Sequence, residues 1–337
     1  MQKAQKSADR LVKIIEQFSK LSITVLGDLI ADEFIYGEIS RVSREAPVLI
    51  LRHRDRTVVP GGAGNAIYNL ADLGVTVLPV GVIGDDEPGR MLLHAFRQKH
   101  ISVSGIRRIK GRGTVTKTRV LAGTTHSPRQ QVIRVDREPE IPLDPATIRD
   151  ITFQARGYVR ASDALLISDY GYGAATPEIF DNIRSRAFLN GFPVTLDSRY
   201  RTLAYSGVTA ATPNESELEE LLGTRIGNDN ARLFATGKAV MQKMKLQSLL
   251  VTRGKDGMVV FSRGNNPVPI PIYGSDEVAD VTGAGDTVIA TYTAALAAGA
   301  DSESAARLAN YAGGIVVMKR GTATVTRAEL LRAVVEG

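Results

Sequence analysis

The feature that most constrains the fold of this chain is a regular alternation of strand-like and helix-like segments after residue 144. Short aliphatic runs typical of buried strands lie at 164–167, 193–196, 208–211, 248–251 and 258–261. Segments with helical spacing lie after 144, at 177–188, after 214, and at 231–244, 284–298 and 302–317. Such alternation is typical of a mostly parallel sheet covered by helices on both faces. The sequence therefore predicts an α/β fold.

Two strand-rich stretches in the N-terminal half do not fit that sheet. They cover about residues 34–59 and 112–135, and they place Arg and Thr where a buried strand carries aliphatic residues. Strands of this kind are exposed on one face. We expect them to be insertions that form a small β lid on a single domain spanning residues 1–337. The other N-terminal elements that we expect are strands at 23–26 and 76–83, and helices at 8–18, from the glycine cluster 61–64 to 73, and at 87–99.

Composition excludes several classes of site. The chain of 337 residues has no cysteine, which excludes disulfides, thiolate metal sites and a cysteine nucleophile. Its net charge of +6 is spread along the chain without basic blocks, so we expect no nucleic-acid partner. No apolar run approaches the roughly 18 residues of a membrane span, and the N-terminus lacks the apolar core of a signal peptide. We therefore expect a cytoplasmic protein without membrane contact.

The strongest chemical signal is the segment DVTGAGD at 280–286, which runs directly into an apolar helix. A glycine loop at a helix N-terminus directs free backbone N–H groups and the positive end of the helix dipole at one point. The N–H groups of Ala284, Gly285 and Asp286 therefore predict an anion site. A carboxylate is costly in such a site, and proton abstraction from an attacking hydroxyl would explain Asp286. The alternative is an ordinary glycine turn with Asp near the N-cap.

Other catalytic motifs are absent from the sequence. There is no P-loop motif, and the glycines at 62 and 64 lack the third glycine of a dinucleotide fingerprint. The four histidines show no metal-ligand spacing, and no serine occupies a G-x-S-x-G turn. The glycine loop at 280–286 is therefore the main guide to function.

Two signatures near opposite ends of the chain resemble those of a known enzyme family. GGAGN at 61–65 and DVTGAGD at 280–286 are together similar to the signature pair of the ribokinase-like sugar kinases, also called the PfkB carbohydrate kinases. Within that family, further segments resemble the D-glycero-D-manno-heptose 7-phosphate kinases, which make the 1,7-bisphosphate. These segments lie, in order, at 27–37, 40–47, 60–62, 129–134, 168–171 and 319–325.

The resemblance implies a ribokinase-like three-layer α/β/α fold and ATP-dependent phosphorylation of a sugar phosphate hydroxyl, a phosphotransfer to an alcohol group. It implies that Asp286 is the general base and that Gly283, Ala284 and Gly285 complete the catalytic loop. Residues matching the positions that grip the sugar are Asp32, Gly61, Gly62 and Asn65. Candidates for the substrate phosphate are Arg129, Arg134 and Arg199, together with Arg41 and Arg44.

The resemblance also implies a nucleotide site with Mg²⁺ and ATP as cofactors. Asn214 and Glu217 match an N-x-x-E motif that organises Mg²⁺ and its waters, although the same pair also fits a helix capping box. The other residues implied at the ATP site are Thr252, Gly254, Gly257 and Asn310, and Arg253 or Lys255 would reach its phosphates. Asp280 is the implied ligand of a monovalent cation such as K⁺.

Two positions depart from the heptose-kinase pattern and keep other interpretations open. Tyr172 stands where the pattern has Lys, and Arg199 belongs to Asp-Ser-Arg where Asp-Pro-Lys is usual. One alternative is therefore a kinase of the same family for another sugar or sugar phosphate. A non-catalytic sugar or nucleotide sensor is the other, and it would be expected to lose Asp286 or the Asn214/Glu217 pair. Some heptose kinases are fused to an adenylyltransferase, but the sequence has no H-x-G-H motif, so we expect that activity elsewhere.

The exposed strands expected in the lid also indicate that two chains associate. Exposed strand edges invite pairing with a second chain unless something covers them. We therefore expect a homodimer formed through lid strands that carry Val48, Ile50, Val58, Val115 and Val120.

Overall fold

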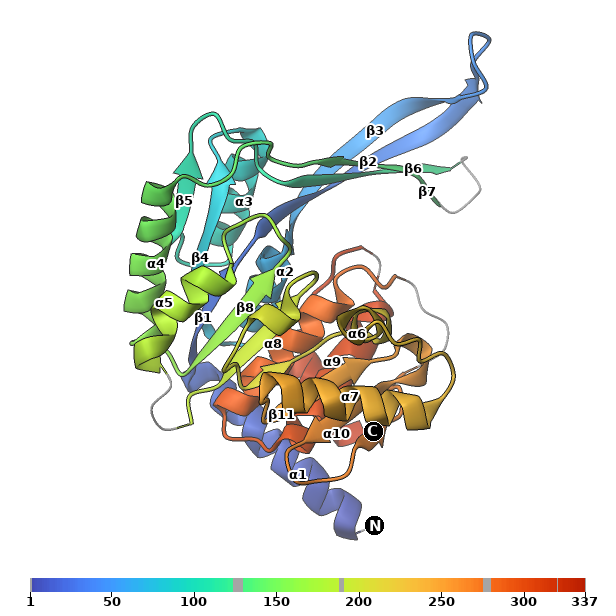
Figure 1. The fold of residues 1–337 in the computed structure, drawn as a ribbon. Helices are drawn as coiled ribbons and strands as arrows, with labels where there is room; N and C mark the ends of the chain where they lie inside the picture. The colour runs from blue at the N-terminus through green and yellow to red at the C-terminus, as the bar shows by residue number, and fades with distance from the viewer. Residues whose placement is uncertain (1, 124–129, 188–190, 275–279, 320, 337) are drawn as a thin grey trace.

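The computed structural model describes residues 2–123, 130–187, 191–274, 280–319 and 321–336 (Figure 1). Its centre is a nine-stranded sheet with the order β13-β12-β11-β10-β9-β8-β1-β4-β5. The strands are β1 (Ser22–Gly27), β4 (Thr76–Gly84), β5 (Ile106–Ile109), β8 (Ala164–Asp169), β9 (Val194–Ser198), β10 (Ala210–Ala211), β11 (Ser248–Thr252), β12 (Met258–Ser262) and β13 (Val268–Ile270). Neighbours from β5 to β11 in this order pair in parallel. At one edge of the sheet, β12 pairs antiparallel with both β11 and β13.

Helices cover both faces of this sheet because successive strand residues point to opposite sides. On β8, Leu166 packs into one core, whereas Leu165 and Ile167 pack into the other. The first core is completed by α1 (Gln2–Gln17), α2 (Ala63–Asp72), α3 (Glu87–Gln98), α8 (Ala284–Ala297), α9 (Ser302–Val317) and α10 (Arg327–Glu336). The second is completed by α4 (Pro145–Val159), α5 (Pro177–Ala187), α6 (Glu215–Leu222) and α7 (Asn230–Met244). The expected three-layer α/β/α fold is confirmed.

A second, four-stranded sheet has the order β3-β2-β6-β7 and extends away from the helical layers (Figure 1). Its strands are β2 (Leu29–Val42), β3 (Leu49–Gly62), β6 (Thr116–Gly123) and β7 (Gln130–Arg137). It overlaps both stretches predicted to form the lid. The expectation that Val115 lies on an exposed edge is wrong, because Val115 is only 6% exposed and its carbonyl accepts the N–H of Ala31 at the base of this sheet.

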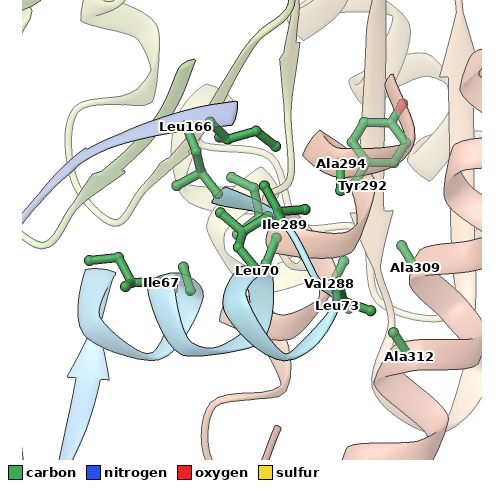
Figure 2. Close-up of a cluster of buried hydrophobic side chains, with 14 of the residues drawn as sticks. Ile67, Leu70, Leu73, Leu166, Val288, Ile289, Tyr292, Ala294, Ala309 and Ala312 are labelled. Carbon is green, nitrogen blue, oxygen red and sulfur yellow. The ribbon is translucent and has the colours of Figure 1, made fainter. Parts of the chain in front are cut away.

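Packing between α2 and α8 brings two distant parts of the sequence together. Figure 2 shows Leu70 of α2 and its C-cap Leu73 beside Val288 and Ile289 of α8, and all four side chains are buried. The N-termini of the two helices also meet, since the Asn65 side-chain amide donates to the Gly283 carbonyl at 3.0 Å. In the part of the chain described here, no helix is long and apolar enough to cross a membrane.

Candidate active site

The candidate site lies at the point in the sheet where the strand order reverses. From β1 the chain adds β4 and β5 on one side and later β8 and β9 on the other. β1 is flanked by β4 on one side and by β8 on the other, and ligands of open α/β sheets bind beside the carboxyl ends of strands at such a switch point. The residues that line a pocket there are Asp169, Tyr170, Asp197, Arg199, Thr212, Asn214, Glu217, Thr252 and Gly285.

Asp286 is a buried carboxylate in the first turn of α8, beside this pocket, and it is 5% exposed. Its Oδ1 accepts a hydrogen bond from the Tyr170 hydroxyl at 2.9 Å, and its Oδ2 accepts one from Asn65 Nδ2 at 3.1 Å. Burial raises the pKa of Asp286 to about 7; the two hydrogen bonds oppose that shift, the Asp32 carboxylate adds to it, and Lys117 opposes it. A carboxylate with this pKa can exchange a proton near neutral pH.

Gly283 is needed at the N-cap of α8. Its φ of +79° lies in the left-handed region, and a Cβ there would overlap the amide of Asn65. That amide also donates to the Gly283 carbonyl at 3.0 Å, so Asn65 connects α2 both to the cap and to Asp286. The glycine thus permits a close approach that orients the carboxylate.

The anion site predicted at the N-terminus of α8 is smaller than expected. The N–H of Ala284 donates to the Val281 carbonyl at 3.2 Å and closes a turn. Gly285 and Asp286 lie in the first turn of the helix, where backbone N–H groups have no partner within the helix. These two groups are the ones positioned to bind an anion.

The loop after β8, which carries Tyr170, is anchored by the carboxylate of Asp28. Asp28 accepts backbone N–H groups from Tyr170, Tyr172 and Ala174 at 2.9, 3.0 and 2.9 Å. Burial raises its pKa to about 6 although those hydrogen bonds lower it. The motifs at 27–37 and 168–171 include Asp28 and Tyr170 but indicate no role for either, because their contacts join residues more than 100 positions apart.

Residues predicted to hold the sugar lie between the four-stranded sheet and α2. Asp32 on β2 is buried, and its Oδ1 pairs with Arg119 on β6 at 2.5 Å. Gly61 lies against the other Asp32 oxygen, where a Cβ would overlap it, and Gly62 precedes α2. The structure therefore brings Asp32, Gly61, Gly62 and Asn65 together.

Lys117 is a residue near this site that sequence reasoning missed. It is paired in register with Asp32, and its Nζ lies 5.4 Å from the centre of the Tyr170 ring. Burial lowers the pKa of Lys117, the carboxylates Asp32 and Asp136 raise it, and the cations Arg134 and Arg199 lower it further. The only sequence signal was the alternation of Lys117 and Arg119 on one face of a predicted strand.

On the opposite side of the pocket, Asn214 and Glu217 begin α6. Asn214 Oδ1 accepts the Glu217 N–H at 2.8 Å and Glu217 Oε2 accepts the Asn214 N–H at 3.0 Å, so the capping-box interpretation is confirmed. Burial raises the pKa of Glu217, and burial together with the charge of Glu217 raises that of Asp197. Thr212 adds a buried hydroxyl with no partner in the described part of the chain.

Of the arginines predicted for the substrate phosphate, only Arg134 and Arg199 lie near a common residue, since both act on the pKa of Lys117. Arg199 lines the pocket with Asn214 and Glu217, whereas Arg134 lies on β7 and pairs with Asp136 at 2.9 Å. Arg41 and Arg44 are exposed near the outer end of β2, and Arg129 lies outside the described residues. Arg199 therefore lies beside residues predicted for the nucleotide and also within the electrostatic range of Lys117.

Among the remaining residues predicted for the nucleotide, one lines the pocket and three do not. Thr252 lines it and bridges to Asn214, whereas Gly254, Gly257 and Asn310 are not among the lining residues. Asn310 instead donates to the Pro271 carbonyl at 2.9 Å. The Asp280 carboxylate accepts the N–H groups of Thr282 and Gly321, which hold its pKa below the ordinary value against the effect of burial.

Comparison with known proteins identifies the family. Residues 20–329 match the pfkB family carbohydrate kinases. The chain belongs to that family. It is 38% identical over 322 residues to "Bifunctional protein HldE" of Pelobacter propionicus, covering 95% of this chain and 64% of that protein. The protein of the same name in Geobacter metallireducens is 40% identical over 312 residues, covering 92% and 62%. The chain thus spans less than two thirds of the length of these relatives.

Solved structures support the same fold. Arabidopsis thaliana ribokinase complexed with ribose and ATP matches with a TM-score of 0.72 at 19% identity, covering 93% of this chain and 98% of that one. Escherichia coli phosphofructokinase-2 in complex with potassium matches with a TM-score of 0.73 at 17% identity, covering 94% and 98%. These structures confirm the expected fold. The family match carries the enzyme class, a phosphotransferase that acts on a sugar hydroxyl.

Proposed function

We propose that this chain transfers the γ-phosphoryl group of ATP to a hydroxyl of D-glycero-D-manno-heptose 7-phosphate and forms the 1,7-bisphosphate. The observation that carries this proposal is the buried Asp286 at the N-terminus of α8, next to a pocket lined by Asn214 and Glu217. Family membership supports the kinase chemistry, and the ordered motifs that resemble heptose 7-phosphate kinases support the choice of sugar.

In the proposed reaction the sugar hydroxyl approaches Asp286, which accepts its proton as the oxygen attacks the γ-phosphorus. The bond from that phosphorus to the β,γ-bridging oxygen breaks, and ADP leaves. Asp32 and Asn65 orient the sugar, because both are buried polar side chains beside the base. The N–H groups of Gly285 and Asp286 stabilise negative charge on the phosphoryl oxygens. Because the pKa of Asp286 is about 7, a large fraction of this carboxylate is ionised at neutral pH and is still basic enough to accept the proton of the sugar hydroxyl.

The residues opposite the base fit a magnesium ion that is bound mainly through water. Glu217 uses Oε2 in the capping box and keeps Oε1 for a ligand, and Asp197 places a second carboxyl group in the same pocket. Oxygen donors of this kind suit Mg²⁺, which usually keeps several waters. Bound Mg²⁺ would neutralise charge on the ATP phosphates.

We assign Arg199 to the nucleotide phosphates, because it lines the pocket beside Asn214 and Glu217. For the substrate phosphate we propose Lys117 and Arg134, which lie on the face of the four-stranded sheet that carries Asp32. Lys117 makes no ion pair within the described residues, so its charge is available to a phosphate.

One observation favours a different sugar phosphate as a second candidate. Tyr172 occupies the position where heptose kinases are expected to have Lys, and its hydroxyl donates to Glu138 at 2.8 Å. This position therefore supplies no cation to a substrate phosphate. A kinase of the same family with another phosphorylated sugar as substrate fits that difference.

A substrate panel tests the proposal. Purified protein is mixed with Mg·ATP and heptose 7-phosphate, unphosphorylated heptose, ribose or fructose 6-phosphate, and ADP release is measured. We expect heptose 7-phosphate to give the highest kcat/KM and Asp286→Asn to abolish the signal. A higher kcat/KM for fructose 6-phosphate would favour the second candidate, and an equal value for the two heptoses would contradict a phosphate-binding role for the sugar site.

A further inference from the structure

Both oxygens of the Asp286 carboxylate are held by neutral donors from different elements. The Tyr170 hydroxyl comes from the loop after β8, and the Asn65 amide comes from α2. Neither donor carries a charge, so they fix the carboxylate in place without forming an ion pair. An ion pair would hold a carboxylate ionised and would make it a poor proton acceptor.

The position of Tyr170 is fixed by the loop on which it stands. Asp28 accepts three backbone N–H groups of that loop, including the N–H of Tyr170 itself. The preceding residue, Asp169, is held by the Tyr205 hydroxyl at 2.9 Å and by Arg201. Lys117 covers the Tyr170 ring from β6. The hydroxyl is therefore directed at Asp286 by contacts that need no substrate.

Several charged groups face Asp286 from the surrounding elements, and their effects oppose one another. Asp32 on β2 disfavours the ionised carboxylate, and Lys117 on β6 favours it. Asp197 on β9 also lies within the electrostatic range of Asp286. Burial and the neighbouring carboxylates keep the pKa of Tyr170 well above its ordinary value of 10, so the tyrosine stays a donor at every working pH.

We propose that Tyr170 is a positioning residue for phosphoryl transfer, because its hydroxyl orients the Asp286 carboxylate and keeps it ionised as the sugar hydroxyl binds. This inference rests on the proposed role of Asp286 as the base, but it does not depend on which sugar is the substrate. Removing the hydroxyl would leave Asn65 as the only hydrogen-bond donor to Asp286 that the structure describes.

The test is the pH dependence of kcat in Tyr170→Phe, measured from about pH 5.5 to about pH 9 with the sugar that gives the best rate. Without the hydrogen bond, the acidic limb of the profile should move to higher pH by about one unit, and kcat at about pH 6 should fall roughly tenfold. KM for ATP should change little. In an Asp286→Asn background, the tyrosine substitution should produce no further loss of kcat.

Tyr172→Phe is the matched control, since Tyr172 belongs to the same loop but donates to Glu138. It should leave the acidic limb in place. A loss in Tyr170→Phe that is equal at every pH, an unmoved limb, or an equal shift in Tyr172→Phe would overturn the inference.

A second readout does not need activity and separates this inference from the proposed function. If the Tyr170 hydroxyl stabilises ionised Asp286, Tyr170→Phe should lose more unfolding free energy relative to the parent at about pH 8 than at about pH 5. A pH-dependent difference in a protein that phosphorylates no sugar would support the hydrogen-bond role and reject the kinase proposal. A difference that is constant with pH would reject the role of Tyr170 even in an active kinase.

Discussion

Asp286 shows at the scale of a single residue how function and stability oppose each other. Its ionised form is required for proton abstraction, yet burial raises its pKa to about 7. Two neutral hydrogen bonds recover part of the cost of burying the charge. The residue is thus held at a pKa that suits a base, at the expense of folding free energy near neutral pH.

Replacing this base should abolish catalysis without weakening nucleotide binding. Asp286→Asn should lower kcat by roughly 10²–10⁴-fold, because general base catalysis contributes a factor of that order. The affinity for Mg·ATP, measured by calorimetry, should change little because Gly285 and Glu217 remain in place. A variant that keeps more than about a tenth of the parental kcat would rule out Asp286 as the base.

The same variant should change how stability depends on pH. When folding raises the pKa of an acid, that group contributes to the free energy of unfolding in full only at pH values below its unfolded pKa. The contribution is lost as the pH rises through the folded pKa. For Asp286 this window runs from 3.8 to about 7. Relative to the parent, Asp286→Asn should therefore gain about 3 kcal/mol of unfolding free energy between about pH 5 and about pH 8. Urea unfolding at both pH values checks this, and a difference that does not grow with pH would contradict it.

Arg199 provides a test of how the pocket is divided between the two substrates. Because it lines the pocket with Asn214 and Glu217, Arg199→Ala should raise KM for ATP by roughly tenfold or more, as expected when a charge-assisted hydrogen bond is lost. KM for the sugar phosphate should change much less. The reverse pattern in steady-state kinetics would return Arg199 to the substrate phosphate.

At the scale of elements, the helix α8 is flanked by two glycines with left-handed backbone conformation, one in a crowded place and one in an open place. Gly283 has a φ of +79° and faces Asn65, while Gly299 has a φ of +83° and nothing within 4 Å of a built Cβ. Gly299→Ala should therefore cost only about 1–2 kcal/mol of backbone strain. Gly283→Ala should in addition displace Asn65 and lower kcat at least tenfold, on the scale of a misplaced catalytic group. Thermal unfolding and kcat of both variants check this, and equal kcat values would refute it.

Elements with a strong pattern of their own were predictable from the sequence. The strand expected at 164–167 appears as β8 (Ala164–Asp169), and the helix expected at 231–244 appears as α7 (Asn230–Met244). The short β5 and β13 and the helix α10 were not predicted. β5 and β13 have only four and three residues, and they exist through pairing with β4 and β12 rather than through a periodic pattern.

The site was predictable where one short segment carried the chemistry, as in the loop at 280–286 and the cap of α6. Its supporting contacts were not. Tyr170 and Asp286 are 116 positions apart, and only the packing of β8 and α8 brings them together. Likewise, Lys117 approaches the site through the register of β6 with β2, which no local pattern specifies.

At the scale of the whole molecule, the four-stranded sheet has two unlike faces. Register places Asp32, Lys117 and Arg119 on the face that contributes to the site. The opposite face carries the ion pairs of Glu33 with Arg56 and Arg137. It also carries apolar residues in cross-strand contact, since Val120 pairs with both Ile35 and Ile133. Exposed apolar surface on a single sheet suggests an interface that a second copy would cover.

We therefore expect a homodimer formed through the four-stranded sheet. Ile133 and Val135 on β7 are 54% and 48% exposed, so burying them against a partner would remove apolar surface from water. Sedimentation at micromolar concentration should show twice the 36.3 kDa of one chain. The double variant Ile133→Asp/Val135→Asp should shift the population to monomers because it would bury four carboxylates in the dimer. Val335→Asp on α10, at a residue 70% exposed and remote from this sheet, should remain dimeric. A parent that sediments only as a monomer, or a control that dissociates equally, would refute this interface.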